Sequence, residues 1–196
     1  KDANFEKDNW AVFFPAGTFY EDFYLDFDVK DNVMTVQNDL TAVHNNFLVT
    51  VLDNSTNNDE KTFIASVKNG KLSYNNTKRI DNTFSTYTKK LGEFKVSRDT
   101  IAPRVSISKS IEGKWITNQK AIQLYISDEM SGVNTYNGFI NGNWVLFEYE
   151  HKNNKITHYF DDKFLNEGEN DLKVVVTDNV GNSTIFETRF LRSQKK

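Results

Sequence analysis

The sequence predicts an all-β protein made of two tandem β-sandwich domains. Three observations lead to this fold class. Large apolar residues alternate with polar ones in many short segments, which is the two-residue period of strands. Clusters of Asn, Asp, Gly and Thr separate these segments and are typical of turns. No segment repeats its apolar residues with the period of an amphipathic helix.

The clearest alternation runs from Phe19 to Val29. Phe, Leu or Val occupies every odd-numbered position except that of Glu21, and Tyr or Asp occupies every even-numbered one. In a helix, offsets of three and four would mix the aspartates into the apolar stripe. The segment is therefore predicted to be one strand with one buried face.

Further short apolar or β-branched runs predict the remaining strands. In the first half these lie at 10–14, 44–52, 62–67, 72–74, 84–88 and 93–96, with loops at 53–60 and 75–82. In the second half they lie at 105–108, 121–127, 136–140, 143–149, 156–160, 172–177 and 183–190.

Two turns and one boundary organise these strands. Asn141-Gly142 between apolar runs is the strongest short-range hairpin signal, and the 178–182 segment predicts a longer turn. Pro103 favours an extended residue before it and cannot donate to a strand ladder. We therefore expect domains at residues 1–98 and 99–196.

Composition narrows the function classes. With 16 Phe, 8 Tyr and 3 Trp in 196 residues, the chain can bury substantial cores. The net charge of −3 does not indicate binding to nucleic acid or to an anionic membrane. The absence of cysteine excludes disulfides, thiolate catalysis and cysteine-ligated zinc. No run of 18 apolar residues predicts a transmembrane segment. The chain begins without Met and without a signal-peptide core, so we expect a processed chain or part of a longer one.

Four motifs stand out in the second half: Asp99-Thr-Ile-Ala-Pro103, Asp128-Glu-Met-Ser131-Gly132, Gly168-Glu-Asn170 and Asp178-Asn-Val-Gly181-Asn182. With them, residues 99–192 resemble bacterial immunoglobulin-like repeats, which implies that the second β-sandwich domain is immunoglobulin-like.

Further motifs precede the second half: Phe13-Phe-Pro15, Thr18-Phe-Tyr20-Glu-Asp-Phe23, Ala42-Val-His44-Asn-Asn-Phe47, Gly70-Lys-Leu-Ser-Tyr74 and Leu91-Gly-Glu-Phe94. With these motifs, nearly the whole chain is similar to the C-terminal region of Bacteroidetes envelope proteins of the lysostaphin/LytM-type zinc metallopeptidase family. The resemblance implies an exported protein of the periplasm, outer membrane or cell surface. It also implies an upstream peptidase domain that cuts peptide bonds in peptidoglycan and holds the zinc.

The zinc ligands of that family are not found in this segment. The peptidase needs a His-x-x-x-Asp pair and a His-x-His pair. The histidines here are His44, His151 and His158; only His158 has an aspartate, Asp162, four residues later, and no His-x-His exists. We therefore assign no catalytic residue. We interpret His44 as a partly buried histidine that orders a turn, and the other two as solvated residues facing opposite sides of the chain.

Oxygen ligands from several turns make calcium the one candidate cofactor of the segment itself. Asp99, Asp128, Asp178 and Asn182 come from the start of the second domain and from two turns, which can meet at one end of a sandwich. The simpler interpretation is that these residues make turns and cap backbone N–H groups.

Aromatic residues of the second half suggest a sugar-binding alternative. Trp144, Trp115, Tyr136 and Tyr149 could stack on sugar rings, and core packing competes for the same side chains. Exposure of the tryptophans would favour the sugar site.

The leading functional hypothesis is a non-catalytic accessory region. It would position or dock the upstream peptidase domain at the envelope, or bind a protein partner there. The alternatives are a module that binds peptidoglycan or another glycan, and a subunit of an outer-membrane assembly or secretion complex.

Overall fold

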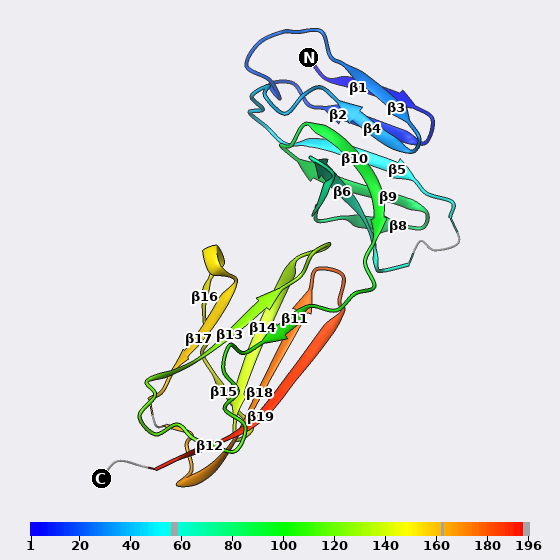
Figure 1. Cartoon of the computed structure of the whole chain (residues 1–196). Coiled ribbons are helices and arrows are strands. Elements are labelled where there is room, and N and C mark those ends of the chain that lie inside the picture. The colour runs from blue at the N-terminus through cyan, green and yellow to red at the C-terminus, as the bar shows by residue number, and fades with distance from the viewer. Residues whose placement is uncertain (56–58, 162, 194–196) are drawn as a thin grey trace. The chain divides into compact units, whose positions relative to one another are not determined.

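The computed structural model describes residues 1–55, 59–161 and 163–193. The chain forms two compact units, Lys1–Thr100 and Ile101–Lys196, and the division lies inside the 98–103 segment. Each unit is a sandwich of two β-sheets, so the predicted all-β fold of two tandem sandwiches is confirmed (Figure 1). In the described part of the chain, no helix is long and apolar enough to cross a membrane.

The first unit pairs two five-stranded antiparallel sheets. One sheet has the order β1 (Ala3–Lys7), β2 (Trp10–Phe14), β5 (Phe47–Leu52), β9 (Thr83–Thr88) and β8 (Lys78–Ile80). The other has the order β3 (Phe27–Lys30), β4 (Val33–Val36), β10 (Gly92–Arg98), β6 (Thr62–Lys68) and β7 (Lys71–Tyr74).

The core of this unit is built from the inward-facing residues of both sheets. Trp10, Phe47 and Phe84 come from one sheet, and all are almost completely buried. Met34 and Phe94 come from the other sheet and are fully buried. Burying each such side chain contributes about 1.5–3 kcal/mol, which makes this cluster the main source of the unit's stability.

The strand predicted over 19–29 is wrong for most of its length. Only Phe27–Lys30 is a strand, and it pairs with β4 up to Val36. At the next residue the partner strand ends, because Gln37 has a φ of 51° and turns the chain away. The preceding residues then have no strand to pair with. Their side chains still divide between the core and the solvent, since Phe19 and Leu25 contact the core and Tyr24 is exposed.

The second unit has the strand arrangement of an immunoglobulin fold. One sheet has the order β11 (Arg104–Ser106), β13 (Ala121–Ser127), β17 (Lys155–Tyr159) and β16 (Glu148–Glu150). The other has the order β12 (Lys114–Trp115), β19 (Ser183–Arg192), β18 (Gly168–Asp178), β14 (Val133–Ile140) and β15 (Asn143–Val145). These correspond to the ABED and GFC sheets of immunoglobulin domains, with β15 added next to the C strand. A single turn of 3₁₀ helix, η1 (His151–Asn153), follows β16.

The segment predicted as one strand over 143–149 instead divides between the two sheets. Asn143–Val145 pairs with β14, whereas Glu148–Glu150 pairs with β17. The link contains Phe147, which is buried in the core. Its ring packs so close to Gly138 that a Cβ atom there would lie 2.2 Å from Cε2 of the phenyl ring. The ring thus fills the core at the point where the chain passes from one sheet to the other.

The hairpin predicted at Asn141-Gly142 is confirmed. The two residues have φ angles of 51° and 78°, as a type I′ turn requires. The predicted loop over 75–82 is partly wrong, because it contains the short edge strand β8. All residues of that strand are exposed, so no alternation of buried apolar and exposed polar residues marks it in the sequence.

Candidate functional site

Two loops of the second unit are each organised by one aspartate. In the loop after β13, Oδ1 of Asp128 accepts hydrogen bonds from the N–H groups of Met130 (3.1 Å) and Gly132 (2.6 Å). The glycine has a φ of 82°, a conformation that side chains disfavour. The carboxylate therefore acts as the cap of this turn.

The turn between β18 and β19 repeats the same arrangement. Oδ1 of Asp178 accepts from the N–H groups of Val180 (3.0 Å) and Asn182 (2.7 Å). Its second oxygen, Oδ2, accepts from the side-chain amide of Asn182 (2.7 Å). Asp178 is only 1% exposed, so these bonds satisfy a buried charge.

Asn179 fixes the two loops to each other. Its side-chain amide donates to the carbonyl oxygens of Ser131 (2.8 Å) and Gly132 (3.1 Å). Its backbone N–H also donates to the carbonyl of Gly132 (3.1 Å). The two loops therefore form one connected end of the immunoglobulin-like unit.

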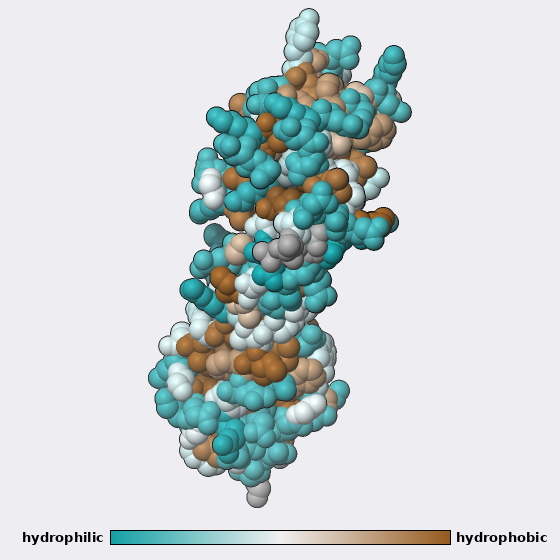
Figure 2. Space-filling view, turned by 90° about the vertical axis from the view of Figure 1, so that its right-hand side faces the viewer, coloured by the Kyte–Doolittle hydropathy of each residue, from teal (hydrophilic) through white to brown (hydrophobic). Residues whose placement is uncertain are grey.

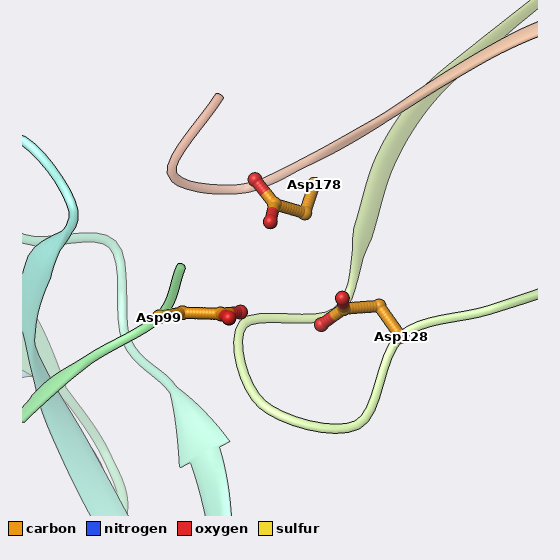
Figure 3. A group of neighbouring side chains, drawn as sticks. All are labelled: Asp99, Asp128 and Asp178. Atoms are coloured by element: carbon orange, nitrogen blue, oxygen red, sulfur yellow. The ribbon is translucent and has the colours of Figure 1, made fainter. Parts of the chain in front are cut away.

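Two of the four predicted calcium ligands lie together in the second unit. Asp128 and Asp178 each offer a carboxylate oxygen, and these oxygens lie within 4.8 Å of each other (Figure 3). Asp99 belongs to the end of the first unit, where its backbone N–H donates to the carbonyl of Lys61 at 3.0 Å. The fourth, Asn182, is hydrogen-bonded to Asp178 through its amide nitrogen. The turn-capping interpretation of Asp128 and Asp178 is confirmed by their hydrogen bonds. Calcium binding stays a prediction, with a ligand set of carboxylate oxygens that suits this ion.

Two of the three histidines, His44 and His158, make hydrogen bonds that stabilise the local structure. The partial burial predicted for His44 is wrong, because the residue is exposed. It shares a hydrogen bond of 3.1 Å with the hydroxyl of Tyr20, and its backbone N–H donates to the carbonyl of Thr18, so it does order the local turn. The solvated position predicted for His158 is wrong. It is 5% exposed, and Nδ1 donates to the carbonyl of Leu146 at 2.9 Å. His151 is exposed in η1, and Asp162 lies outside the described residues.

The four aromatic residues of the predicted sugar site fall into two groups. Trp144 is 55% exposed and Trp115 is 60% exposed. Tyr136 and Tyr149 pack on each other, with ring centroids 5.6 Å apart, and against the core of the unit. The tyrosines therefore support the core, and only the tryptophans present their rings to solvent.

The first unit exposes an apolar face that the sequence did not predict. Across β2, β5 and β9, Phe13, Leu48 and Tyr87 stand directly opposite one another in register and point away from the core. Leu52 and Ile80 lie on the same outer face. We call these five residues the Phe13 face. On the surface shown in Figure 2, both units have brown hydrophobic areas among the hydrophilic ones.

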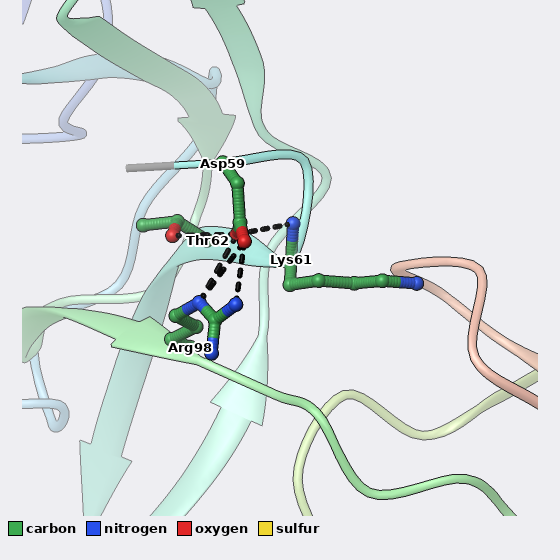
Figure 4. A network of polar contacts seen from close by, with 4 residues as sticks. All are labelled: Asp59, Lys61, Thr62 and Arg98. Carbon is green, nitrogen blue, oxygen red and sulfur yellow. Dashed lines mark hydrogen bonds and ion pairs between the residues drawn. The ribbon is translucent and has the colours of Figure 1, made fainter. Parts of the chain in front are cut away.

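An ion pair fixes the end of the first unit. Arg98 donates to Asp59 through Nε (3.1 and 3.2 Å) and Nη2 (2.5 Å), as Figure 4 shows. The same carboxylate accepts from the N–H of Lys61 at 3.0 Å. The hydrogen bonds from Arg98 are the largest cause that holds the pKa of Asp59 below its ordinary value, and the hydrogen bond from Lys61 acts in the same direction. The contact fastens the last residues of β10 to the loop before β6.

Comparison with known proteins gives one family match. The model of the Zu5-like domain family matches residues 1–99. Among solved structures, the fibronectin(III)-like modules of Clostridium thermocellum CbhA are similar, with 9% sequence identity and a TM-score of 0.38, over 76% of this chain and 86% of that chain. No curated protein matches the chain.

Proposed function

The chain belongs to the family of Zu5-like domains, and on that basis we propose that it is a non-catalytic interaction module. Its first unit is the Zu5-like domain, and its second is an immunoglobulin-like sandwich. Sandwiches of this kind provide rigid sheet faces on which a partner can dock.

The observation that carries this proposal is the Phe13 face. Phe13 and Tyr87 are 36% and 68% exposed although both stand on regular strands, beside Leu48. Removing a large apolar side chain from water contributes about 1.5–3 kcal/mol, and interfaces concentrate their affinity in a few such side chains. A partner that covers this row would gain that contribution without reorganising the sheet.

We further propose that the module belongs to an exported cell-envelope protein with an upstream peptidase of the LytM type. The support is the similarity of the motifs around Phe13, His44 and Tyr74 to the C-terminal region of such proteins. In this proposal the upstream domain holds zinc and cleaves peptidoglycan, and the Phe13 face docks that domain or an envelope partner.

The first test is the intact mass, N-terminal sequence and zinc content of the native protein. We expect a longer chain with about one zinc per molecule, as a single catalytic site would bind. A longer chain without zinc would instead favour a subunit of an outer-membrane assembly. A native chain that begins at Lys1 would refute the peptidase parent.

A second test addresses the docking face directly. The variant Phe13→Thr/Tyr87→Thr keeps β-forming residues on the strands, so the fold should be retained. We expect it to weaken binding to the separately expressed upstream domain, with Trp115→Thr in the other unit as the matched control. Equal binding by both variants would remove the Phe13 face from the interaction. The 196-residue chain alone should not hydrolyse peptidoglycan.

A further inference from the structure

A second row of side chains crosses the outer face of the immunoglobulin-like unit. Trp144 stands opposite Phe139, Phe139 opposite Lys173, and Lys173 opposite Glu187, across β15, β14, β18 and β19. Residues opposite each other share one face of a sheet, so all four side chains point to the same side. We call these four residues the Trp144 row. Three strand spacings make it about 14 Å long.

The aromatic end of this row is flat and held in place. Trp144 is 55% exposed, and its indole Nε1 donates to Oδ1 of Asn137 at 3.3 Å. This bond and the neighbouring ring of Phe139 limit the rotation of the indole. A ring that is already ordered loses little conformational freedom when a ligand stacks on it.

The other end of the row offers charged and polar groups. Lys173 and Glu187 form an ion pair of 3.4 Å, and Arg189 forms another with Glu169, also at 3.4 Å. Lys173, Glu187 and Arg189 line a surface hollow of about 730 Å³ beside Phe139, together with Glu112 and Asp171. With three acidic and two basic side chains, the hollow does not favour a polyanion. It offers hydrogen-bond donors and acceptors to a neutral ligand instead.

We propose that the Trp144 row binds a neutral oligosaccharide chain lying across the strands. Pyranose rings have an apolar C–H face and a rim of hydroxyl groups. The C–H face would stack on Trp144 and Phe139, and the hydroxyls would hydrogen-bond to Lys173 and Glu187. An open face of this length suits a stretch of polysaccharide more than a single sugar. This activity goes beyond the proposed docking role and uses the other unit of the chain.

The test is isothermal titration of the full 196-residue chain with two neutral probes, chitohexaose and cellohexaose. We expect at least one of them to bind, and we expect Trp144→Ala to lower the affinity about tenfold or more, as for the loss of a central aromatic contact. Trp144→Phe should retain part of the binding. Trp115→Ala is the matched control, because it removes an equally exposed indole outside the row.

Three results would overturn the proposal. The first is the absence of binding by both probes at millimolar concentrations. The second is equal loss of binding in the Trp144→Ala and Trp115→Ala variants while circular dichroism shows both to be folded. The third is a concentration-dependent dimer of the wild-type chain, abolished by Trp144→Ala, which would assign the row to contact with a second copy. None of these results bears on the Phe13 face, so the two proposals fail separately.

Discussion

Replacing Gly138 by alanine should destabilise the second unit, although glycine is normally unfavourable in a strand. A Cβ atom at this position would lie 2.2 Å from Cε2 and 2.4 Å from Cδ2 of Phe147. The ring is 3% exposed and has His158 as a neighbour at 5.4 Å between centroids, so it has little room to move. Overpacking of this kind costs about 1–3 kcal/mol.

Two effects of the substitution oppose each other. The backbone of Gly138 is not in the positive-φ region, so alanine would gain about 0.5–1 kcal/mol by restricting the unfolded chain. Because a contact of 2.2 Å is far inside the van der Waals distance, the overpacking cost should lie in the upper part of its range, about 2–3 kcal/mol. Subtracting the gain leaves a net loss of about 1–2.5 kcal/mol. For a unit of this size the loss corresponds to a Tm lower by roughly 4–20 °C. Differential scanning calorimetry of the full chain measures it.

A double-mutant cycle separates the clash from other causes. If Phe147 is the obstacle, Phe147→Leu should recover part of the stability lost by Gly138→Ala, giving a coupling energy of about 0.5–3 kcal/mol. Gly142→Ala is the control, because its φ of 78° strains any side chain while nothing lies within 4 Å of the new Cβ. Its effect should add to that of Phe147→Leu. A Gly138→Ala variant as stable as the wild type would refute the close packing of ring and strand.

Three further outcomes are expected. When calcium is added back after treatment with a chelator, it should raise the Tm of the wild-type chain but not that of an Asp128→Asn/Asp178→Asn variant. If the wild-type Tm does not change, both aspartates only cap turns. Asp178→Ala should lower the stability of the second unit by about 1–3 kcal/mol in urea denaturation, because buried N–H groups lose their acceptor. The hydrogen-bonded ion pair with Arg98 lowers the pKa of Asp59 in the folded chain. The ion pair therefore stabilises the fold above the pKa of the carboxyl in the unfolded chain, about 3.9, and this stabilisation is lost as the pH falls through the lower pKa of the folded chain. Asp59→Asn should therefore lower the Tm at pH 7 but not in strong acid; a Tm difference independent of pH would contradict this.

The accuracy of the sequence predictions follows the pairing of the strands. The strand predicted over 121–127 is found as Ala121–Ser127, because it has partners on both sides and one buried face. The strand prediction failed before Phe27, where apolar and polar residues alternate but the partner strand has already turned away at Gln37. A two-residue period reports which side chains face the core, whereas hydrogen bonding to a neighbour decides whether the segment is a strand.

Of the two candidate sites in the second unit, one could be predicted from the sequence and the other could not. The carboxylates of Asp128 and Asp178 could be predicted to meet because each begins a turn, and an immunoglobulin-like sandwich brings those turns to one end. The Trp144 row could not be predicted. Its members are separated by up to 48 positions in the sequence, from Phe139 to Glu187, and only the register between strands places them side by side.

Strand β5 shows how a docking face can be recognised in a sequence. Phe47, Val49 and Val51 fill the core, yet Leu48 and Leu52 on the opposite parity are apolar as well. A run that is apolar on both parities usually indicates a strand covered on both faces. In a two-layer sandwich the second face is open, so this excess of apolar residues has no partner within the unit. The same run that predicts a central strand therefore also indicates the face on which we propose that a partner docks.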